Sequence, residues 1–254
     1  MSPKKHGYDV TMRDTKSLQL YFERKRVKAS RETIRRTLFG MGGHYVKAVH
    51  EYAEADLKKQ LAFAKRTLKT LRSMDKDTIA LFEDEMSAGG SLRKGYGWTF
   101  DDRLVIKAPA YHMKRTNVFG TVSLLTGEIV QSSFASAKTP AFMEFLRRIA
   151  DAFSGKKIVL YMDNFRVHSP EKTRRFLKLH PDLKVRFFPP YSPRLNPQEY
   201  WWNYLRRKLL NNRFFRSARQ MAFVMGRFVK SVYSEEVMGV CSLNPLRKIL
   251  KDGV

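Results

Sequence analysis

The apolar positions at the start of the chain recur every three to four residues, which is typical of short amphipathic helices. One helix is predicted from about Ser17, and a second from Arg31, with Ser30 as its N-cap and glycines from Gly40 onward as its stop. Two short helices separated by about four residues, the second rich in arginine, predict a helix-turn-helix module. A packed pair of basic helices without that function explains the pattern equally well.

A longer helical stripe follows over residues 53–73. Its apolar side chains fall on one face, and the helix is expected to link the N-terminal module to the rest of the chain. The stripe consists of Leu57, Leu61, Ala64, Leu68 and Leu71.

From Thr78 the pattern changes to short apolar runs, which predict strands. Further strands are predicted over 103–109 and within 117–134, where two strands meet at Thr126–Gly127. Several strands in succession, followed by alternating helices and strands, predict an α/β fold: a mixed sheet with helices on both faces. The later elements are helices over 140–155, 169–180 and 196–212 and strands over 156–164 and 183–189.

The net charge of the chain indicates what kind of molecule it binds. The 254 residues carry 49 Lys and Arg against 24 Asp and Glu, a net charge of +25 with a pI near 10.3. The excess is concentrated at the two ends of the chain and predicts a polyanionic partner, although ribosomal and membrane-surface proteins share such a charge. The sequence contains no apolar run of the roughly 18 residues that a membrane span needs, and no signal peptide is evident. The single cysteine, Cys241, fits a reducing compartment, and we expect a cytoplasmic, nucleoid-associated protein.

Three acids lie where predicted elements begin or end. Asp84 and Asp163 each follow an apolar strand, and Glu199 opens a predicted helix. Each acid alone is more often a turn former. If the two strands are neighbours, however, the aspartates lie within reach of one divalent ion. Carboxylates without sulfur or a histidine pair favour Mg²⁺ or Mn²⁺, and paired ions of this kind support phosphodiester chemistry.

The segments YMDNFRVHSP and FFPPYSPRLNPQEYWWNYLR resemble the catalytic core of mariner-superfamily transposases, in particular those of bacterial insertion sequences. LFEDE matches the first acidic strand, DNxxxH the second acid and PxYSPxLNPxE the third, with 35 residues between Asp163 and Glu199. The resemblance implies an RNase H-like fold with Asp84, Asp163 and Glu199 as catalytic metal ligands. It also favours the helix-turn-helix interpretation.

Residues beside the acids have two interpretations each. Asn164 could orient a carboxylate or cap a loop, and His168 could touch DNA or a metal-bound water, or be structural. Glu83 and Glu85 are expected to point away from Asp84 and to be solvated or salt-bridged, although Glu85 could also support a metal ligand.

The proline loop and the helix after it carry the most specific prediction. Pro189, Pro190, Pro193 and Pro197 fix the backbone, which would place Glu199 in a first helical turn, within metal-bridging distance of the two aspartates. Because adjacent helical residues lie about 100° apart, only one of Trp201 and Trp202 is expected in the core.

Basic residues near the predicted helices are candidates for DNA contact, with a solvated surface as the alternative for each. They are Arg31, Arg35, Arg36, Arg194, Arg206, Arg207 and Lys208.

The resulting hypothesis is a DNA transposase that cuts and transfers strands with Mg²⁺ or Mn²⁺, acting on double-stranded DNA as a homodimer. The alternatives are an RNase H-like nuclease without strand transfer and a non-catalytic DNA-binding protein derived from a transposase. Members of the family usually carry two helix-turn-helix units, and only the second is evident here. The predicted organisation is a partial helix-turn-helix module (1–48), a linker helix (49–75), an RNase H-like catalytic domain (76–235) and a C-terminal tail (236–254).

Overall fold

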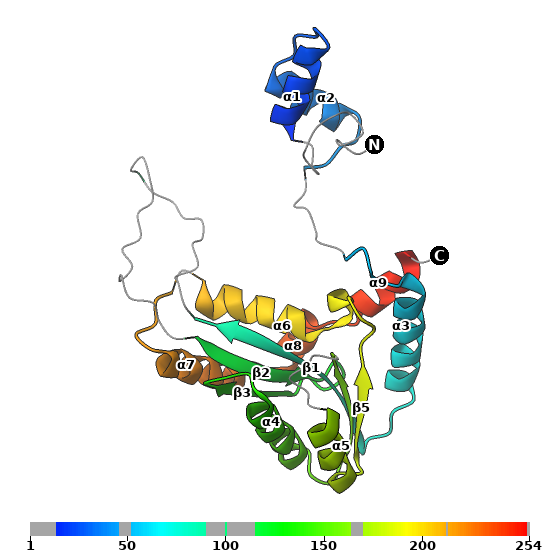
Figure 1. The fold of residues 1–254 in the computed structure, drawn as a ribbon, viewed down its shortest axis with the longest axis vertical. Helices are drawn as coiled ribbons and strands as arrows, with labels where there is room; N and C mark the ends of the chain where they lie inside the picture. Colours follow the sequence, from blue (N-terminus) through cyan, green and yellow to red (C-terminus); the bar gives the residue numbers. More distant parts are fainter. Residues whose placement is uncertain are drawn as a thin grey trace. The chain divides into compact units, whose positions relative to one another are not determined.

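The computed structural model describes residues 14–45, 52–89, 100, 115–163, 170–211 and 213–252. The chain divides into two compact units, residues 1–51 and 52–254, which are considered separately (Figure 1).

The first unit contains the two predicted basic helices, α1 (Thr15–Arg24) and α2 (Arg31–Gly40). The Asp14 side chain caps α1 by accepting from the Ser17 backbone N–H, so this helix begins two residues before the predicted start. The predicted Ser30 cap of α2 is confirmed, since its hydroxyl accepts from the backbone N–H of Thr33. Ile34 is the single buried apolar side chain among the described residues of this unit, so its helices share little core.

The second unit is built on a five-stranded mixed sheet with strand order β3-β2-β1-β4-β5. The central strand β1 pairs antiparallel with β2 and parallel with β4, which confirms the predicted mixed sheet. The strand predicted over 103–109 lies outside the described residues. The strands are β1 (Thr78–Ala88), β2 (Thr116–Val122), β3 (Ile129–Phe134), β4 (Lys157–Met162) and β5 (Leu183–Phe187).

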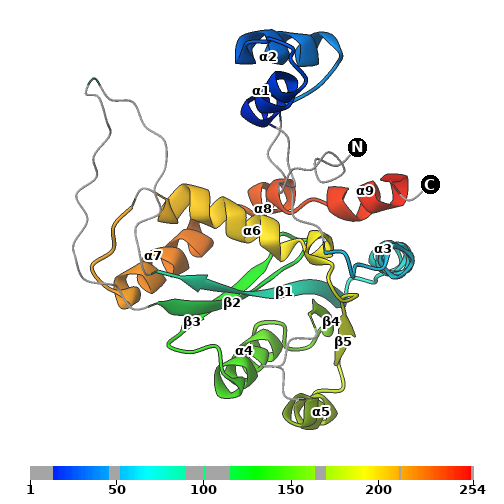
Figure 2. The same ribbon diagram turned by 45° about the horizontal axis from the view of Figure 1, so that its top comes forward.

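Helices cover both faces of the sheet, and the alternation of β1 explains why. Ala80 and Phe82 lie in one apolar cluster, while Ile79 and Leu81 lie in a second on the opposite face. Figure 2 shows α4 and α5 on one side of the sheet and α6 and α8 on the other. The second cluster includes α4 (Thr139–Ala152) and α5 (Pro170–Leu179); the first includes α3 (Leu57–Arg72), α6 (Gln198–Leu205), α7 (Ala218–Ser231), α8 (Ser234–Val240) and α9 (Asn244–Asp252).

Helix α3 packs directly on the sheet. The Phe63 ring lies 5.8 Å from the Tyr161 ring of β4 and 5.3 Å from the Phe188 ring, centroid to centroid. Most of the predicted apolar stripe is covered, but Leu57 is half exposed, contrary to the prediction. Asp56 is the N-cap of this helix, so Leu57 is its first residue. The buried positions begin only at Phe63, and the first turn therefore lies outside the core.

The two C-terminal helices also join the first apolar cluster, through Val237 of α8 and Leu246 of α9. Within the described part of the chain, no helix combines the length and apolar character needed to cross a bilayer.

The predicted β2–β3 connection at Thr126–Gly127 is confirmed and yields a stability prediction. Gly127 has φ +70°, and a Cβ there would lie 2.2 Å from the Ser234 backbone oxygen. Gly155 has a similar φ of +82° but open space around it. We expect Gly155→Ala to lower the free energy of unfolding by about 1–2 kcal/mol, the cost of the left-handed backbone, and Gly127→Ala to lower it by about 1–3 kcal/mol more. Urea unfolding followed by circular dichroism measures both, and equal losses would contradict the proposed steric contact.

Candidate active site

The sheet register brings the two aspartates to neighbouring strand ends. The strands β1 and β4 run parallel, with Phe82 opposite Tyr161 at the end of their pairing. Asp84 and Asp163 each lie two residues further along their strands. Neighbouring strands are about 4.8 Å apart, so the predicted adjacency of these acid-bearing strands is confirmed.

The proline loop leads from β5 into α6 by a short, well-packed path. Pro193–Leu195 form one turn of 3₁₀ helix, and Pro197 precedes α6 with φ −64°. Tyr191 adopts a left-handed φ of +56°, which is uncommon for a residue with a side chain. Glu199 lies in the first turn of α6, as predicted.

Two side-chain hydrogen bonds join this segment to β1. Asn196 Nδ2 donates to the backbone oxygen of Glu83 over 3.0 Å, and Trp202 Nε1 donates to Oδ2 of Asp84 over 3.1 Å. Asn196 lies three residues before Glu199 and Trp202 three residues after it. Glu199 is therefore held between two contacts to consecutive residues of β1.

Electrostatics confirm that the acids influence one another. The pKa of Asp84 is raised well above its usual value, first by burial and then by the negative charge of Glu199, with a smaller contribution from Asp163. The backbone N–H of Glu85 opposes this shift by hydrogen bonding to the Asp84 carboxylate. The charges of Glu199 on α6 and of Asp163, just after β4, thus both act on Asp84.

Glu83 corrects one prediction, because it is neither solvated nor salt-bridged. Its side chain is 1% exposed, and its Oε1 has no hydrogen-bond partner among the described residues. Burial, followed by the charges of Glu85, Asp84 and Asp163, raises its pKa well above the usual value. The alternation of β1 turns Glu83 away from Asp84, but the helices on that face cover it.

Glu85, the residue after Asp84, is affected by the charge of the second aspartate. Burial, and then the charge of Asp163, raises the pKa of Glu85 to about 7. Asn164 and His168, the other predicted supporting residues, lie outside the described residues.

The donor chemistry at this end of the sheet fits a hard divalent cation. Carboxylate oxygens are the ligands that Mg²⁺ and Mn²⁺ prefer, and the pKa of Asp84 is raised first by burial and then by the charge of Glu199, which a cation would offset. That Asp84, Asp163 and Glu199 lie at metal-bridging distance stays a prediction; the described residues contain no group of three Asp, Glu, His or Cys side chains arranged to hold an ion.

Both tryptophans of α6 are fully buried, so the prediction of a single core tryptophan is wrong. Trp202 faces β1 and β2, while Trp201 stacks with Tyr204 and Phe228 and donates from Nε1 to Gln131 Oε1 over 3.2 Å. Helix α6 is covered by the sheet and also by neighbouring helices, which buries two directions of its surface.

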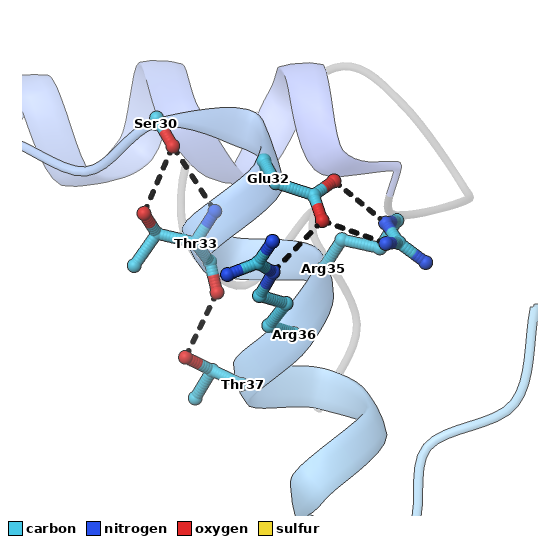
Figure 3. A network of polar contacts seen from close by, with 6 residues as sticks. All are labelled: Ser30, Glu32, Thr33, Arg35, Arg36 and Thr37. Atoms are coloured by element: carbon cyan, nitrogen blue, oxygen red, sulfur yellow. Dashed lines mark hydrogen bonds and ion pairs between the residues drawn. The ribbon is translucent and has the colours of Figure 1, made fainter.

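Two of the arginines predicted to contact DNA from α2 share one acidic partner (Figure 3). Glu32 accepts from Arg35 over 2.6 and 2.8 Å and from Arg36 over 3.0 Å. These bonds lower the pKa of Glu32 to about 2, with Arg35 the larger cause. Arg31 donates weakly to Gln19 over 3.4 Å.

The basic residues after Glu199 differ in their surroundings. Arg206 and Arg207 line a pocket of about 510 Å³, together with Tyr200, Asn203, Asn211 and Val240. Lys208 does not line it and instead places its ammonium 5.5 Å from the Tyr204 ring centroid. Arg194 lies in the 3₁₀ turn of the proline loop, where its charge acts on Tyr200.

The raised pKa of Glu85 predicts how stability depends on pH. The folded state holds the Glu85 proton more tightly than the unfolded state, so this contribution is fully present below about pH 4.5 and is lost as the pH rises through about 7. We expect the melting temperature, measured in EDTA, to fall between about pH 5.5 and 8, and to fall less in Glu85→Gln. Glu171→Gln, which changes an exposed acid of α5, should keep the wild-type slope. An unchanged slope in Glu85→Gln would contradict the assignment.

Solved structures similar to this chain are complexes and domains of the Mos1 transposase. A Mos1 paired-end complex with the left transposon end superposes with a TM-score of 0.70 at 14% identity, covering 95% of this chain and 74% of that one. A Mos1 paired end complex with Mg gives 0.68, also at 14% identity, with 95% and 74% coverage. The Mos1 catalytic domain gives 0.59 at 13% identity, covering 81% of this chain and 97% of that one. The predicted RNase H-like mixed sheet flanked by helices is confirmed.

Two relatives come from bacteria. The IS630 insertion element 39 kDa protein of Shigella sonnei is 23% identical over 165 residues, which are 65% of this chain and 48% of that protein. The chain thus spans about half the length of this relative. The protein y4pE/y4sA of Sinorhizobium fredii (strain NBRC 101917 / NGR234) is 32% identical over 100 residues, covering 39% of this chain and 71% of that protein.

The family model described as DDE superfamily endonuclease matches residues 80–222. This range contains Asp84, Asp163 and Glu199 and the elements that bring them together. The resemblance noted in the sequence is confirmed: the chain belongs to the DDE superfamily endonucleases and is related to the IS630 and Mos1 proteins.

Proposed function

We propose that the protein is a DNA transposase that cuts and transfers the strands of an insertion sequence in a metal-dependent reaction. The observation that carries the proposal is that the charges of Glu199 and Asp163, two acids far from Asp84 in the sequence, both act on Asp84 at one end of the sheet. The tether of α6 to β1 places Glu199 where its charge acts on Asp84. Membership of the DDE endonuclease family supports the same chemistry.

Asp84, Asp163 and Glu199 would hold Mg²⁺ or Mn²⁺ through their carboxylate oxygens. The metal would supply an activated nucleophile and stabilise the leaving oxygen at phosphorus. Asp84 and Asp163 come from adjacent strands of the rigid sheet, whereas Glu199 comes from a helix held by Asn196 and Trp202. This arrangement combines two fixed ligands with a third whose position depends on the α6 contacts.

The reaction would proceed in two displacements at phosphorus. Water first attacks a phosphodiester at the end of the element, breaking the bond to the 3′-oxygen and releasing a 3′-hydroxyl and a 5′-phosphate. The 3′-hydroxyl then attacks a target phosphodiester, forming a new phosphorus–oxygen bond and displacing the target's 3′-oxygen. Neither step requires a covalent bond between protein and DNA.

Double-stranded DNA is the proposed partner, at both the element ends and the target. The net charge of +25 and the exposed arginines of α2 support this proposal. Two of the similar Mos1 structures are paired-end complexes, which supports a homodimer that bridges two ends. In a bacterial cell the protein would act on the nucleoid.

The metal-ligand assignment is tested by single substitutions. We expect Asp84→Ala, Asp163→Ala and Glu199→Ala each to reduce Mg²⁺-dependent cleavage of a duplex carrying the element's terminal repeats by at least about 10³-fold, because each removes a proposed ligand of the metal. Denaturing gels of end-labelled duplex measure nicking, and joined products report strand transfer.

Asp151→Ala provides the matched control, since it removes an exposed acid from α4 without touching the site. Cleavage that survives either Asp163→Ala or Glu199→Ala would refute the triad. Nicks without any joined product would favour a nuclease. A wild-type protein that cleaves no DNA either with or without Mg²⁺ would favour a non-catalytic DNA-binding protein.

The ion pairs that Arg35 and Arg36 share with Glu32 predict that a substitution of Glu32 tightens DNA binding. Glu32→Gln removes the anion that holds Arg35 and Arg36, so both become available to phosphates. We expect several-fold tighter duplex binding at low salt and a steeper dependence of affinity on salt, by about one to two counterions.

Glu144→Gln is a close control, because Glu144 of α4 binds Arg147 and Arg148 in the same i+3 and i+4 geometry. Fluorescence anisotropy across a salt series compares the two variants. If both tighten binding equally, the effect is one of net charge and the assignment of α2 as a DNA contact fails.

A further inference from the structure

The indole of Trp202 makes an unusual contact for a core side chain, because it binds a candidate metal ligand. Its ring is completely buried, and its Nε1 donates to Oδ2 of Asp84 over 3.1 Å. An indole N–H is a donor only, so the contact always engages an acceptor oxygen of the carboxylate. One oxygen of Asp84 is thereby fixed, and the rotation of the carboxylate is restricted.

The sheet leaves space for this ring at one glycine. Gly120 of β2 is the cross-strand partner of Asp84. A Cβ at Gly120 would lie 2.5 Å from Cη2 of Trp202 and 2.6 Å from Nε2 of Gln198. Any larger residue there would displace the indole, so the Trp202 ring can lie opposite Asp84 only because residue 120 is a glycine.

The same ring couples two of the acids. Trp202 and Glu199 are three residues apart on α6 and therefore lie on one side of the helix. The bond from Trp202 to Asp84 therefore ties the helix that carries Glu199 to the strand that carries Asp84. The contact thus sets both the orientation of one carboxylate and the approach of another.

We infer that Trp202 is a positioning residue for the divalent metal: its N–H holds Oδ2 of Asp84 so that the remaining oxygen is directed to the ion, and Gly120 provides the room for this contact. The inference rests on the proposed function, since it requires Asp84 to bind metal. Hydrogen bonds that orient metal ligands typically change metal affinity by about 10–100-fold when they are removed.

The neighbouring tryptophan offers a matched control. Trp201 is equally buried on the same helix, and its Nε1 also donates to a side-chain oxygen, that of Gln131, over 3.2 Å. Trp201→Phe and Trp202→Phe therefore remove the same atoms and the same kind of bond, but only the second bond reaches a carboxylate of the site.

The experiment measures Mn²⁺ binding to the full chain without DNA, by electron paramagnetic resonance of the free ion. We expect Trp202→Phe to weaken Mn²⁺ binding by about tenfold or more, and Trp201→Phe by less than about twofold. Gly120→Ala, which retains the indole but displaces it, should weaken binding as Trp202→Phe does. Equal effects of the two tryptophan substitutions, or no effect of Trp202→Phe, would overturn the inference.

Asp84→Ala separates this inference from the proposed function. If Asp84→Ala binds Mn²⁺ like the wild type, the metal site itself is wrongly assigned. If Asp84→Ala abolishes binding while Trp202→Phe does not alter it, the site stands and the positioning role fails.

A measurement on folded chains with Trp202 intact covers the case in which Trp202→Phe does not fold. The Nε1–H signal of Trp202 can be assigned by nuclear magnetic resonance through elimination, using Trp98→Phe and Trp201→Phe. Its chemical shift should change on addition of Mg²⁺, whereas that of Trp201 should remain constant. If the chemical shift of the Trp202 Nε1–H does not change at saturating Mg²⁺, the proposal is overturned.

Discussion

The candidate site depends on the attachment of α6 to β1. Asn196 reaches the backbone of Glu83, and Trp202 reaches the side chain of Asp84, so a segment far along the sequence is fixed to the central strand at consecutive residues. Glu199 lies midway between these contacts. Without them, the first turn of α6 would have no side-chain hydrogen bond to β1 among those the structure describes, and the prolines alone would fix only local backbone angles. The loop limits the path of the chain, while the two hydrogen bonds determine where it arrives.

This attachment holds the site in an electrostatically unfavourable state. Burial and mutual repulsion raise the pKa values of Glu83, Asp84 and Glu85, and their repulsion lowers the stability of the fold at neutral pH. The apolar clusters on the two faces of the sheet compensate, since both contain several completely buried aromatic rings. A stable scaffold can therefore carry repelling acids at its edge, and their repulsion would be relieved by protons or by the divalent cation that the proposed function requires.

The sequence was sufficient to predict the five strands of the sheet and the place of Glu199 in a first turn, whereas it gave the adjacency of the strands that lead to Asp84 and Asp163 only as a condition. These features follow from local patterns, because strand ends and helix starts have signals in nearby residues. The burial of Glu83 and of both tryptophans could not be predicted in this way. Periodicity within one element assumes a single covered face, whereas α6 lies between the sheet and other helices, and the face of β1 that carries Glu83 is covered by distant elements. Trp202 did have one sequence signal, its spacing of three residues from Glu199, but its partner is visible only in three dimensions.

Helix α6 and the turn that continues it carry an acid of the candidate site and basic residues at separate positions. One side of the helix presents Glu199 and Trp202 toward β1, while Arg206 and Arg207 line the polar pocket further along. Arg206 lies seven positions after Glu199 along the helix, a rise of about 10 Å, which corresponds to about three nucleotides along one strand of B-form DNA. The helix continues as a π-helical turn over Arg206–Leu210, and such turns alter the direction in which side chains project. A single helix thus separates the anionic group that would bind metal from the cationic groups that would bind flanking phosphates, so neither charge neutralises the other.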